Sequence, residues 1–149
     1  MAIKTIAIGN DHGGTELKFE IVKRLEASGY KVINKGTDTT ESVDYPDMAK
    51  LVCDEVNAGN ADCGILICGT GIGIGIAANK VKGIRAAMCS DCFSAKMARV
   101  HNNANVITFG ARTIGPELAW SIVESYLSAE FEGGRHETRV NKIMELENL

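Results

Sequence analysis

A cysteine precedes the densest glycine cluster in this sequence. Cys68 is followed by residues 69–75, in which glycine alternates with threonine or isoleucine. Alternate glycines let the backbone turn tightly, so that consecutive N–H groups can converge on an oxyanion. A thiol beside such dipoles, or beside a cation, ionises more readily, and the thiolate can take a proton from carbon. The loop and the Thr70 hydroxyl would then stabilise the enediolate that forms.

Other interpretations of this stretch exist. A glycine turn can serve only for close packing of a strand on a helix, and Cys68 can be an ordinary buried cysteine at a strand end. Both alternatives stay open. Three known anion-binding loops do not fit: a dinucleotide-binding loop belongs after the first strand, and a Walker loop needs a Gly-Lys-Ser/Thr that the sequence lacks. A cysteine phosphatase would need an arginine six positions after the cysteine, where Ile74 stands.

The three histidines all stand in polar or glycine-rich settings rather than in apolar stripes. His12 follows Asp11 where the first strand ends, His101 precedes Asn102 before the last strand, and His136 follows a pair of glycines. A histidine can give or take a proton near neutral pH. A single exposed histidine is usually an ordinary surface residue, but we expect these three to lie on the ligand-binding face.

Arg135 and Arg139 are four residues apart, so a helix that begins after Gly134 would place both on one face. Two guanidinium groups at that spacing suit a phosphate dianion, and Arg112 is a third candidate. The alternative is a solvated surface pair bonded to Glu137 or another acid. Because the net charge is −3, a phosphate would have to be held by such a local cluster of cations.

Length and composition indicate a single domain that spans residues 1–149. Of its 149 residues, 45% are hydrophobic and 23% are charged, which suffices for one core. No apolar run approaches the roughly 20 residues of a membrane-spanning helix, and we expect no signal peptide. The five cysteines are odd in number and lie mostly in apolar segments, which favours reduced thiols in the cytoplasm. The negative charge argues against nucleic-acid binding.

Alternating strands and helices predict the fold. The expected helices carry apolar stripes that would face the core, and Leu51 and Leu118 belong to two of these stripes. Lysine and glutamate occupy the other helix faces. Helical crossovers favour parallel strands, so we predict one doubly wound, Rossmann-like α/β/α sandwich with a five-stranded parallel sheet. Strands are expected at residues 5–8, 31–34, 65–68, 85–88 and 106–109, and helices at 15–28, 45–59, 93–100, 117–127 and from 135 onward.

Ligands bind beyond the carboxyl ends of the strands in such sheets. This rule brings together the loops at residues 10–14, 69–75, 89–91 and 110–113, which hold many of the side chains able to do chemistry.

Five motifs together resemble one known family. They are Asp-His-Gly-Gly at 11–14, Tyr-Pro-Asp at 45–47, Gly-Ile-Leu-Ile-Cys-Gly-Thr-Gly-Ile-Gly at 64–73, His-Asn at 101–102 and Phe-Glu-Gly-Gly-Arg-His at 131–136. In this order and spacing they resemble ribose-5-phosphate isomerase type B, a family that also contains galactose-6-phosphate and allose-6-phosphate isomerases. The resemblance implies an aldose–ketose isomerase that interconverts ribose 5-phosphate and ribulose 5-phosphate by ring opening and proton transfer through a cis-enediol(ate).

The resemblance also implies a role for each candidate residue. Cys68 would move a proton between C2 and C1, because Ile74 stands where some members carry a glutamate base. His101, aided by Asp11, would open the furanose ring. Thr70 would complete the catalytic set by holding the enediolate. The remaining candidates would bind substrate. The backbone of Gly69, Gly71, Ile72 and Gly73 would contact the enediolate, the phosphate would be bound by Arg112, Arg135, Arg139, His12 and His136, and the sugar by Tyr45 and Asn102.

Members of the family form dimers or tetramers whose sites combine residues of two subunits, so the resemblance implies a homo-oligomer with the C-terminal helix reaching to its partner. It implies no metal and no organic cofactor, and from charge and hydropathy we expect neither a nucleic-acid nor a membrane partner. A six-carbon substrate, allose 6-phosphate or galactose 6-phosphate, is the alternative within the family. A non-catalytic sugar-phosphate sensor is the alternative outside it, although a sensor leaves Cys68 and His101 without a task.

Overall fold

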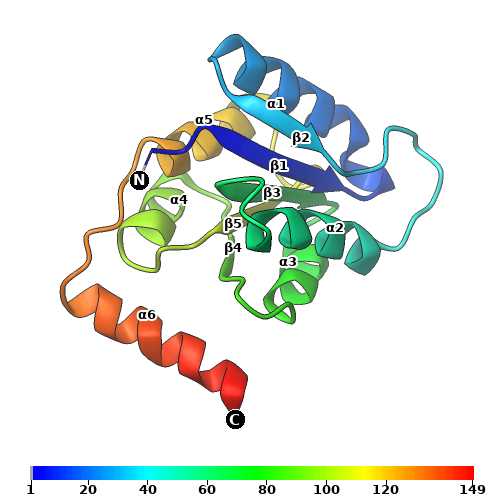
Figure 1. The fold of residues 1–149 in the computed structure, drawn as a ribbon. Helices are drawn as coiled ribbons and strands as arrows, with labels where there is room; N and C mark the ends of the chain where they lie inside the picture. Colours follow the sequence, from blue (N-terminus) through cyan, green and yellow to red (C-terminus); the bar gives the residue numbers. More distant parts are fainter. Residues whose placement is uncertain (1) are drawn as a thin grey trace.

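The computed structural model of the protein describes residues 2–149 and contains one five-stranded sheet (Figure 1). The strand order is β2-β1-β3-β5-β4, and every pair of neighbours is parallel. The predicted parallel sheet is therefore confirmed, with strand ends that shift only slightly from those expected. The strands are β1 (Thr5–Asn10), β2 (Lys31–Asn34), β3 (Cys63–Cys68), β4 (Ala86–Met88) and β5 (Val106–Gly110).

Helices cover both faces of the sheet (Figure 1). On one face pack α1 (Thr15–Ala27), α4 (Cys92–Val100) and α5 (Pro116–Leu127), and on the other pack α2 (Tyr45–Asn57) and α3 (Ile72–Asn79). Side chains of β1 alternate between the two cores, since Ile6 and Ile8 join the first and Ala7 joins the second. The arrangement is the α/β/α sandwich that the sequence predicts.

The C-terminal helix α6 (Arg135–Glu145) lies apart from both helical layers (Figure 1). It continues into a short 3-10 helix, η2 (Leu146–Asn148). Two hydrogen bonds tie this end to the body: the Gly83 N–H donates to Glu147 Oε1 at 2.9 Å, and Arg85 Nη1 donates to Met144 Sδ at 3.4 Å. Apart from these bonds, the helix extends beyond the sandwich (Figure 1). Its contact with a partner subunit stays a prediction.

Two leucines expected to face inward are exposed. Leu51 of α2 is 43% exposed and Leu118 of α5 is 40% exposed. In α2 the buried face is formed by Ala49, Val52 and Cys53, and in α5 the residue after Leu118 begins the buried stripe. Each leucine precedes a buried residue by one position and is turned about 100° away from it.

The structure also bears on two expectations from composition, that the cysteines are reduced and that no helix spans a membrane. All five cysteines are free, as their odd number and apolar settings indicate. None of the helices within residues 2–149 combines the length and the apolarity that crossing a bilayer requires.

Asp62 joins the starts of β1 and β3, and its removal should destabilise the fold. Its Oδ2 accepts hydrogen bonds from the N–H groups of Lys4 at 2.8 Å and Thr5 at 3.0 Å. We expect Asp62→Ala to lower the free energy of unfolding at neutral pH by about 1–3 kcal/mol, since both bonds are charge-assisted. Urea denaturation measures this, and Asp54→Ala, which removes only a surface pair with Lys50, serves as the control.

The same variant should show a pH signature. The Thr5 and Lys4 N–H groups lower the pKa of Asp62 below its ordinary value of 3.8. The folded state thus binds the proton less readily than the unfolded state, and the stabilisation is complete above pH 3.8. It is lost as the pH falls through the lower folded pKa, so the difference between wild type and variant should shrink there. A difference that stays constant into acid would contradict this assignment.

Candidate active site

The carboxyl ends of β1 and β3 adjoin at the point where the order of the sheet reverses. From β1 the chain continues to β2 on one side, whereas from β3 it continues to β4 and β5 on the other. The helices that follow these strands, α1 and α3, cover opposite faces. Open α/β sheets bind their ligands in the crevice at such a switch point.

Backbone hydrogen bonds join the loops at this edge into one rim. The Asp11 N–H donates to the Ile67 carbonyl at 3.1 Å, and the Arg112 N–H donates to the Gly69 carbonyl at 3.0 Å. The loops after β1, β3 and β5 are thereby held side by side. We call the candidates on this rim the carboxyl-edge group: Asp11, His12, Tyr45, Cys68, Arg112 and the glycine loop at residues 69–75.

Cys68 ends β3 and is 5% exposed, which places its sulfur at the base of the rim. Its Sγ accepts a hydrogen bond from the Gly71 N–H at 3.1 Å, so a backbone dipole of the glycine loop points at the sulfur. Burial raises the pKa of Cys53 and of Cys63 to about 12, so those thiols stay protonated near neutral pH. Because a buried strand-end cysteine would occupy the same position, the catalytic role of Cys68 stays a prediction.

The glycine loop turns sharply from β3 into α3. Gly71 has a φ of +78°, and a Cβ at this position would lie 2.7 Å from the Phe109 backbone, so only glycine fits. The Thr108 hydroxyl donates to the Gly71 carbonyl at 2.6 Å and fixes the turn. The sequence leaves open whether a helix follows the loop; α3 does, and the N–H groups of its first turn favour an anion at the rim.

Thr70, Tyr45 and Arg112 surround this loop. The Thr70 hydroxyl accepts a hydrogen bond from the backbone two residues ahead at 3.2 Å, which leaves its proton able to donate to a ligand. Tyr45 packs its ring on Gly73, where an added Cβ would lie 2.8 Å from the Tyr45 Cζ atom. The Arg112 guanidinium lies over Gly69, where an added Cβ would lie 3.4 Å from Nη1. A cation therefore borders the backbone that could hold an oxyanion.

Asp11 and His12 follow β1 at the start of the 3-10 helix η1 (His12–Gly14). The Asp11 Oδ1 accepts a hydrogen bond from the Gly13 N–H at 2.9 Å, so this carboxylate caps the turn. The His12 Nδ1 accepts a hydrogen bond from the Val43 N–H at 3.2 Å. A neutral imidazole that accepts at Nδ1 carries its proton on Nε2. His12 is thus prepared to donate a hydrogen bond from Nε2.

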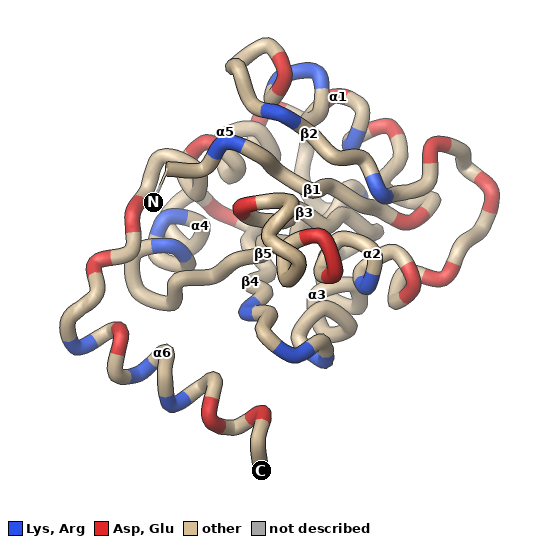
Figure 2. Tube along the Cα trace, viewed as in Figure 1, with Lys and Arg blue, Asp and Glu red and all other residues tan. Residues whose placement is uncertain are grey.

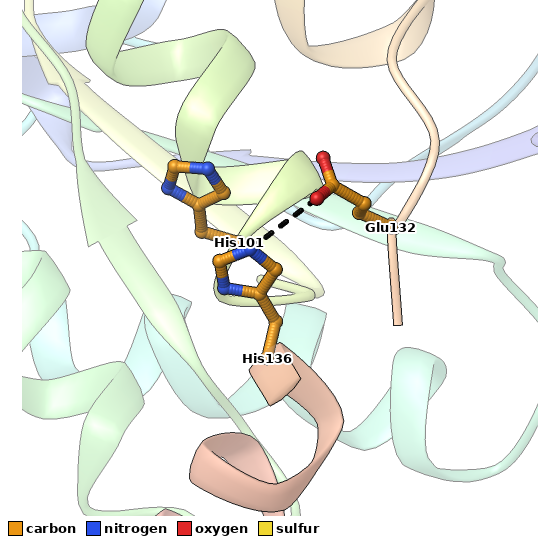
Figure 3. Close-up of side chains that lie close together, drawn as sticks. All are labelled: His101, Glu132 and His136. Atoms are coloured by element: carbon orange, nitrogen blue, oxygen red, sulfur yellow. Dashed lines mark ion pairs between the residues drawn. The ribbon is translucent and has the colours of Figure 1, made fainter. Parts of the chain in front are cut away.

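A second set of candidates lies around α6, and we call it the histidine–arginine group. The rings of His101 and His136 are stacked with centroids 4.3 Å apart (Figure 3). Glu132 lies beside them, with a carboxylate oxygen 3.6 Å from His136 Nε2. Arg135 and Arg139 on α6 are exposed, and neither forms an ion pair within residues 2–149. The members of the group are His101, Asn102, Arg135, His136 and Arg139.

The expectation that the three histidines share one ligand-binding face is wrong for a single chain. His101 follows α4 and precedes β5, so it lies at the amino ends of the strands, whereas Cys68 and His12 lie at the carboxyl ends. These are opposite edges of a parallel sheet. The place of His101 before a strand is the sequence signal that could have shown this. Glu132 lies within the motif at residues 131–136 but is not among the predicted site residues, although its place four residues before His136 is a signal that could have marked it.

His101, Glu132 and His136 also come close enough to be tested as metal ligands. One ligand atom of each lies within 4.8 Å of the others. The two imidazole planes are only 15° apart in the stack, so their lone pairs lie in nearly parallel planes and do not converge. A tetrahedral ion would require one ring to turn. As it stands, the cluster does not present a tetrahedral set of ligands, and the Glu132 carboxylate lies 3.6 Å from His136 Nε2.

Comparison with known proteins shows which family the chain belongs to. Residues 6–143 match the family model described as Ribose/Galactose Isomerase. Ribose-5-phosphate isomerase B of Escherichia coli is 52% identical over 97% of both chains, and D-erythrulose-4-phosphate isomerase of Pectobacterium atrosepticum is 49% identical over 93% of this chain and 92% of its own. The structure of Clostridium thermocellum ribose-5-phosphate isomerase B has a TM-score of 0.95, with 55% identity over 97% of both chains. The chain belongs to the ribose/galactose isomerase family.

Proposed function

We propose that this chain is an aldose–ketose isomerase that interconverts ribose 5-phosphate and ribulose 5-phosphate. The observation that carries the proposal is the Cys68 sulfur, which accepts the Gly71 N–H at the switch point of the sheet. The Escherichia coli and Clostridium thermocellum relatives are named for ribose 5-phosphate, and this chain is 52% identical to the first and 55% identical to the second. All five of its thiols are free, which supports a reducing cytoplasmic location.

Isomerisation requires proton transfers that the carboxyl-edge group can perform. The Cys68 thiolate takes the proton from C2 of the open aldose and returns a proton to C1. The aldehyde oxygen gains a proton and the C2 hydroxyl loses one, so that the aldose becomes the ketose. While the enediolate exists, the Thr70 hydroxyl and the glycine-loop N–H groups other than those bonded to Cys68 and Thr70 stabilise its oxygen, because they are already oriented and need not reorganise.

A second copy of the chain completes the site in this proposal. The histidine–arginine group lies at the opposite edge of its own sheet, so it can reach the substrate only from another subunit. Several large apolar side chains are exposed around α3, β4, α4 and α6, which suits an interface between copies. They are Ile72, Ile76, Met88, Phe93, Ile143 and Leu146.

Charge supports the same arrangement. Figure 2 shows acidic residues along the loop between β2 and α2, and basic residues interspersed with acidic ones on α6. A phosphate near the acidic loop needs compensating cations, and Arg112 supplies only one on this rim. Arg135 and Arg139 of a second copy would supply two more, in the geometry that suits a phosphate dianion.

A substrate comparison tests the function. The purified protein should show its highest kcat/KM with ribose 5-phosphate, compared with allose 6-phosphate and D-erythrulose 4-phosphate. The last is included because a relative at 49% identity is named for it. In deuterium oxide the C2 hydrogen of the aldose should exchange with solvent. If kcat/KM is highest for another sugar phosphate, then that sugar phosphate is the substrate instead of ribose 5-phosphate. Binding without exchange would indicate a sensor and contradict the proposal.

His101→Asn should separate ring opening from proton transfer. Ribulose 5-phosphate cannot close a furanose ring through its phosphorylated C5 oxygen, so only the aldose needs to be opened. With abundant variant enzyme, turnover of ribose 5-phosphate should become limited by spontaneous opening and level off as enzyme is added. Turnover of ribulose 5-phosphate should stay proportional to enzyme. If both directions stay proportional to enzyme, His101 does not open the ring.

A further inference from the structure

Lys18 is a buried cation with no task in the reaction described above. Its side chain is 0% exposed, although it lies on α1 among residues that the sequence pattern assigns to an outer face. Nζ donates to the Thr37 carbonyl at 2.7 Å, to Asn34 Oδ1 at 3.3 Å and to the Asp38 carboxylate. An ammonium group has three N–H donors, and all three are used. Burying a charge so completely is costly unless it is paired in this way.

Two of the three acceptors of Lys18, Thr37 and Asp38, belong to one loop, residues 35–44, which joins β2 to α2 without regular structure. The third acceptor, Asn34, ends β2 directly before this loop. Side chains from the end of β1 and the start of α1 fasten it. Asn10 Nδ2 donates to the Thr37 carbonyl at 3.1 Å, and the Thr15 hydroxyl donates to the Thr39 carbonyl at 2.8 Å. Gly36 presses so closely on Asn10 that an added Cβ would lie 1.9 Å from its Oδ1. The position of the loop therefore depends on these anchors.

The far end of the same loop holds His12. The Val43 N–H donates to His12 Nδ1 at 3.2 Å, and this bond requires that the proton of the neutral ring be on Nε2. A loop that shifts would withdraw the donor, and the imidazole would then be free to exchange tautomers and to turn. The bond thus links the geometry of the loop to the hydrogen-bonding capacity of a residue on the rim.

We propose that Lys18 is a positioning residue: with Asp38 it fastens the loop at residues 35–44 so that Val43 holds His12 in the form that donates from Nε2. The inference rests on the proposed function only in that His12 meets the sugar phosphate. Lys18 acts through the loop and never touches substrate.

The test compares variants that differ in this anchor alone. Lys18→Met keeps the aliphatic stem and removes the charge, and Asp38→Asn removes the counter-charge at a side chain that is 60% exposed. Asp38→Glu restores the carboxylate and is the conservative rescue. Arg24→Met is the matched control, because Arg24 lies on the same helix but pairs with Glu20 and with Glu117 of α5 instead of the loop.

Two measurements decide the question. In wild type, long-range ¹H–¹⁵N spectra should show His12 with an unprotonated Nδ1 and a protonated Nε2. Lys18→Met and Asp38→Asn should show a mixture of tautomers, and kcat/KM should fall by about 10- to 100-fold through misplacement of a binding group. Asp38→Glu and Arg24→Met should keep both the wild-type spectrum and the wild-type kcat/KM.

A purely structural Lys18 would behave differently. A lower melting temperature together with an unchanged His12 tautomer and unchanged kcat/KM would overturn the inference. Asp38→Asn alone suffices if Lys18→Met does not fold, because its replaced side chain is largely exposed. The spectra require no turnover, so they separate failure of this inference from failure of the proposed isomerisation.

Discussion

Replacing Cys68 with alanine should lower kcat for ribose 5-phosphate by about 10²- to 10⁴-fold, the usual contribution of a positioned general base. The Gly71 N–H and the rest of the glycine loop remain in the variant, as does Arg112. Binding of a phosphorylated sugar, measured by calorimetry, should therefore change little while turnover is lost. A variant that loses turnover and keeps its affinity has lost a group that acts in the transition state rather than in ground-state binding.

The control for this prediction is Cys53→Ala. Cys53 and Cys68 belong to the same buried core cluster, so both variants remove a sulfur from similar packing. Burial raises the pKa of Cys53 to about 12, and that thiol has no part in the proposed chemistry. Cys53→Ala should keep wild-type kcat. If Cys68→Ala is as active as this control, then Cys68 is only a buried cysteine at a strand end, and another base must be sought.

The elements of the fold could be predicted because their signals are local. Ile65, Leu66 and Ile67 form an apolar run that ends at a glycine cluster, and such a run is a strand wherever the rest of the chain goes. The glycine loop could be predicted for the same reason, since Gly71 adopts a backbone conformation that other residues avoid. The rule that ligands bind at carboxyl ends of strands then located the carboxyl-edge group.

What could not be predicted depends on contacts between distant segments. Lys18 follows Leu17 on a helix whose other charged residues are not buried, and its own burial depends on contacts with Asn34 and with the loop at residues 35–44. The stack of His101 on His136 likewise joins residues that no local periodicity relates. The motifs showed that these histidines are candidate site residues. The edge of the sheet at which they lie is set by the tertiary structure and could not be read from the motifs.

Mixing two inactive variants should restore activity if two copies share each site. The first variant is Cys68→Ala and the second is Arg135→Ala with Arg139→Ala, so that each removes one of the two groups. A mixed dimer then holds one site with both defects and one site with none. Because half of randomly assorted dimers are mixed, the mixture should recover about one quarter of wild-type activity in a two-fold symmetric dimer.

The result discriminates because a site contained in one chain gives the opposite outcome. In that case every site of the mixture carries one defect, and no recombination of subunits can repair it. Unfolding and refolding the variants together ensures that subunits exchange, and refolding each variant alone is the control, since neither should gain activity. Recovery would show that Cys68 and the two arginines act on the same substrate from different chains. If the mixture stays inactive although size-exclusion chromatography and mass spectrometry detect mixed dimers, then the histidine–arginine group does not complete the site of a second copy.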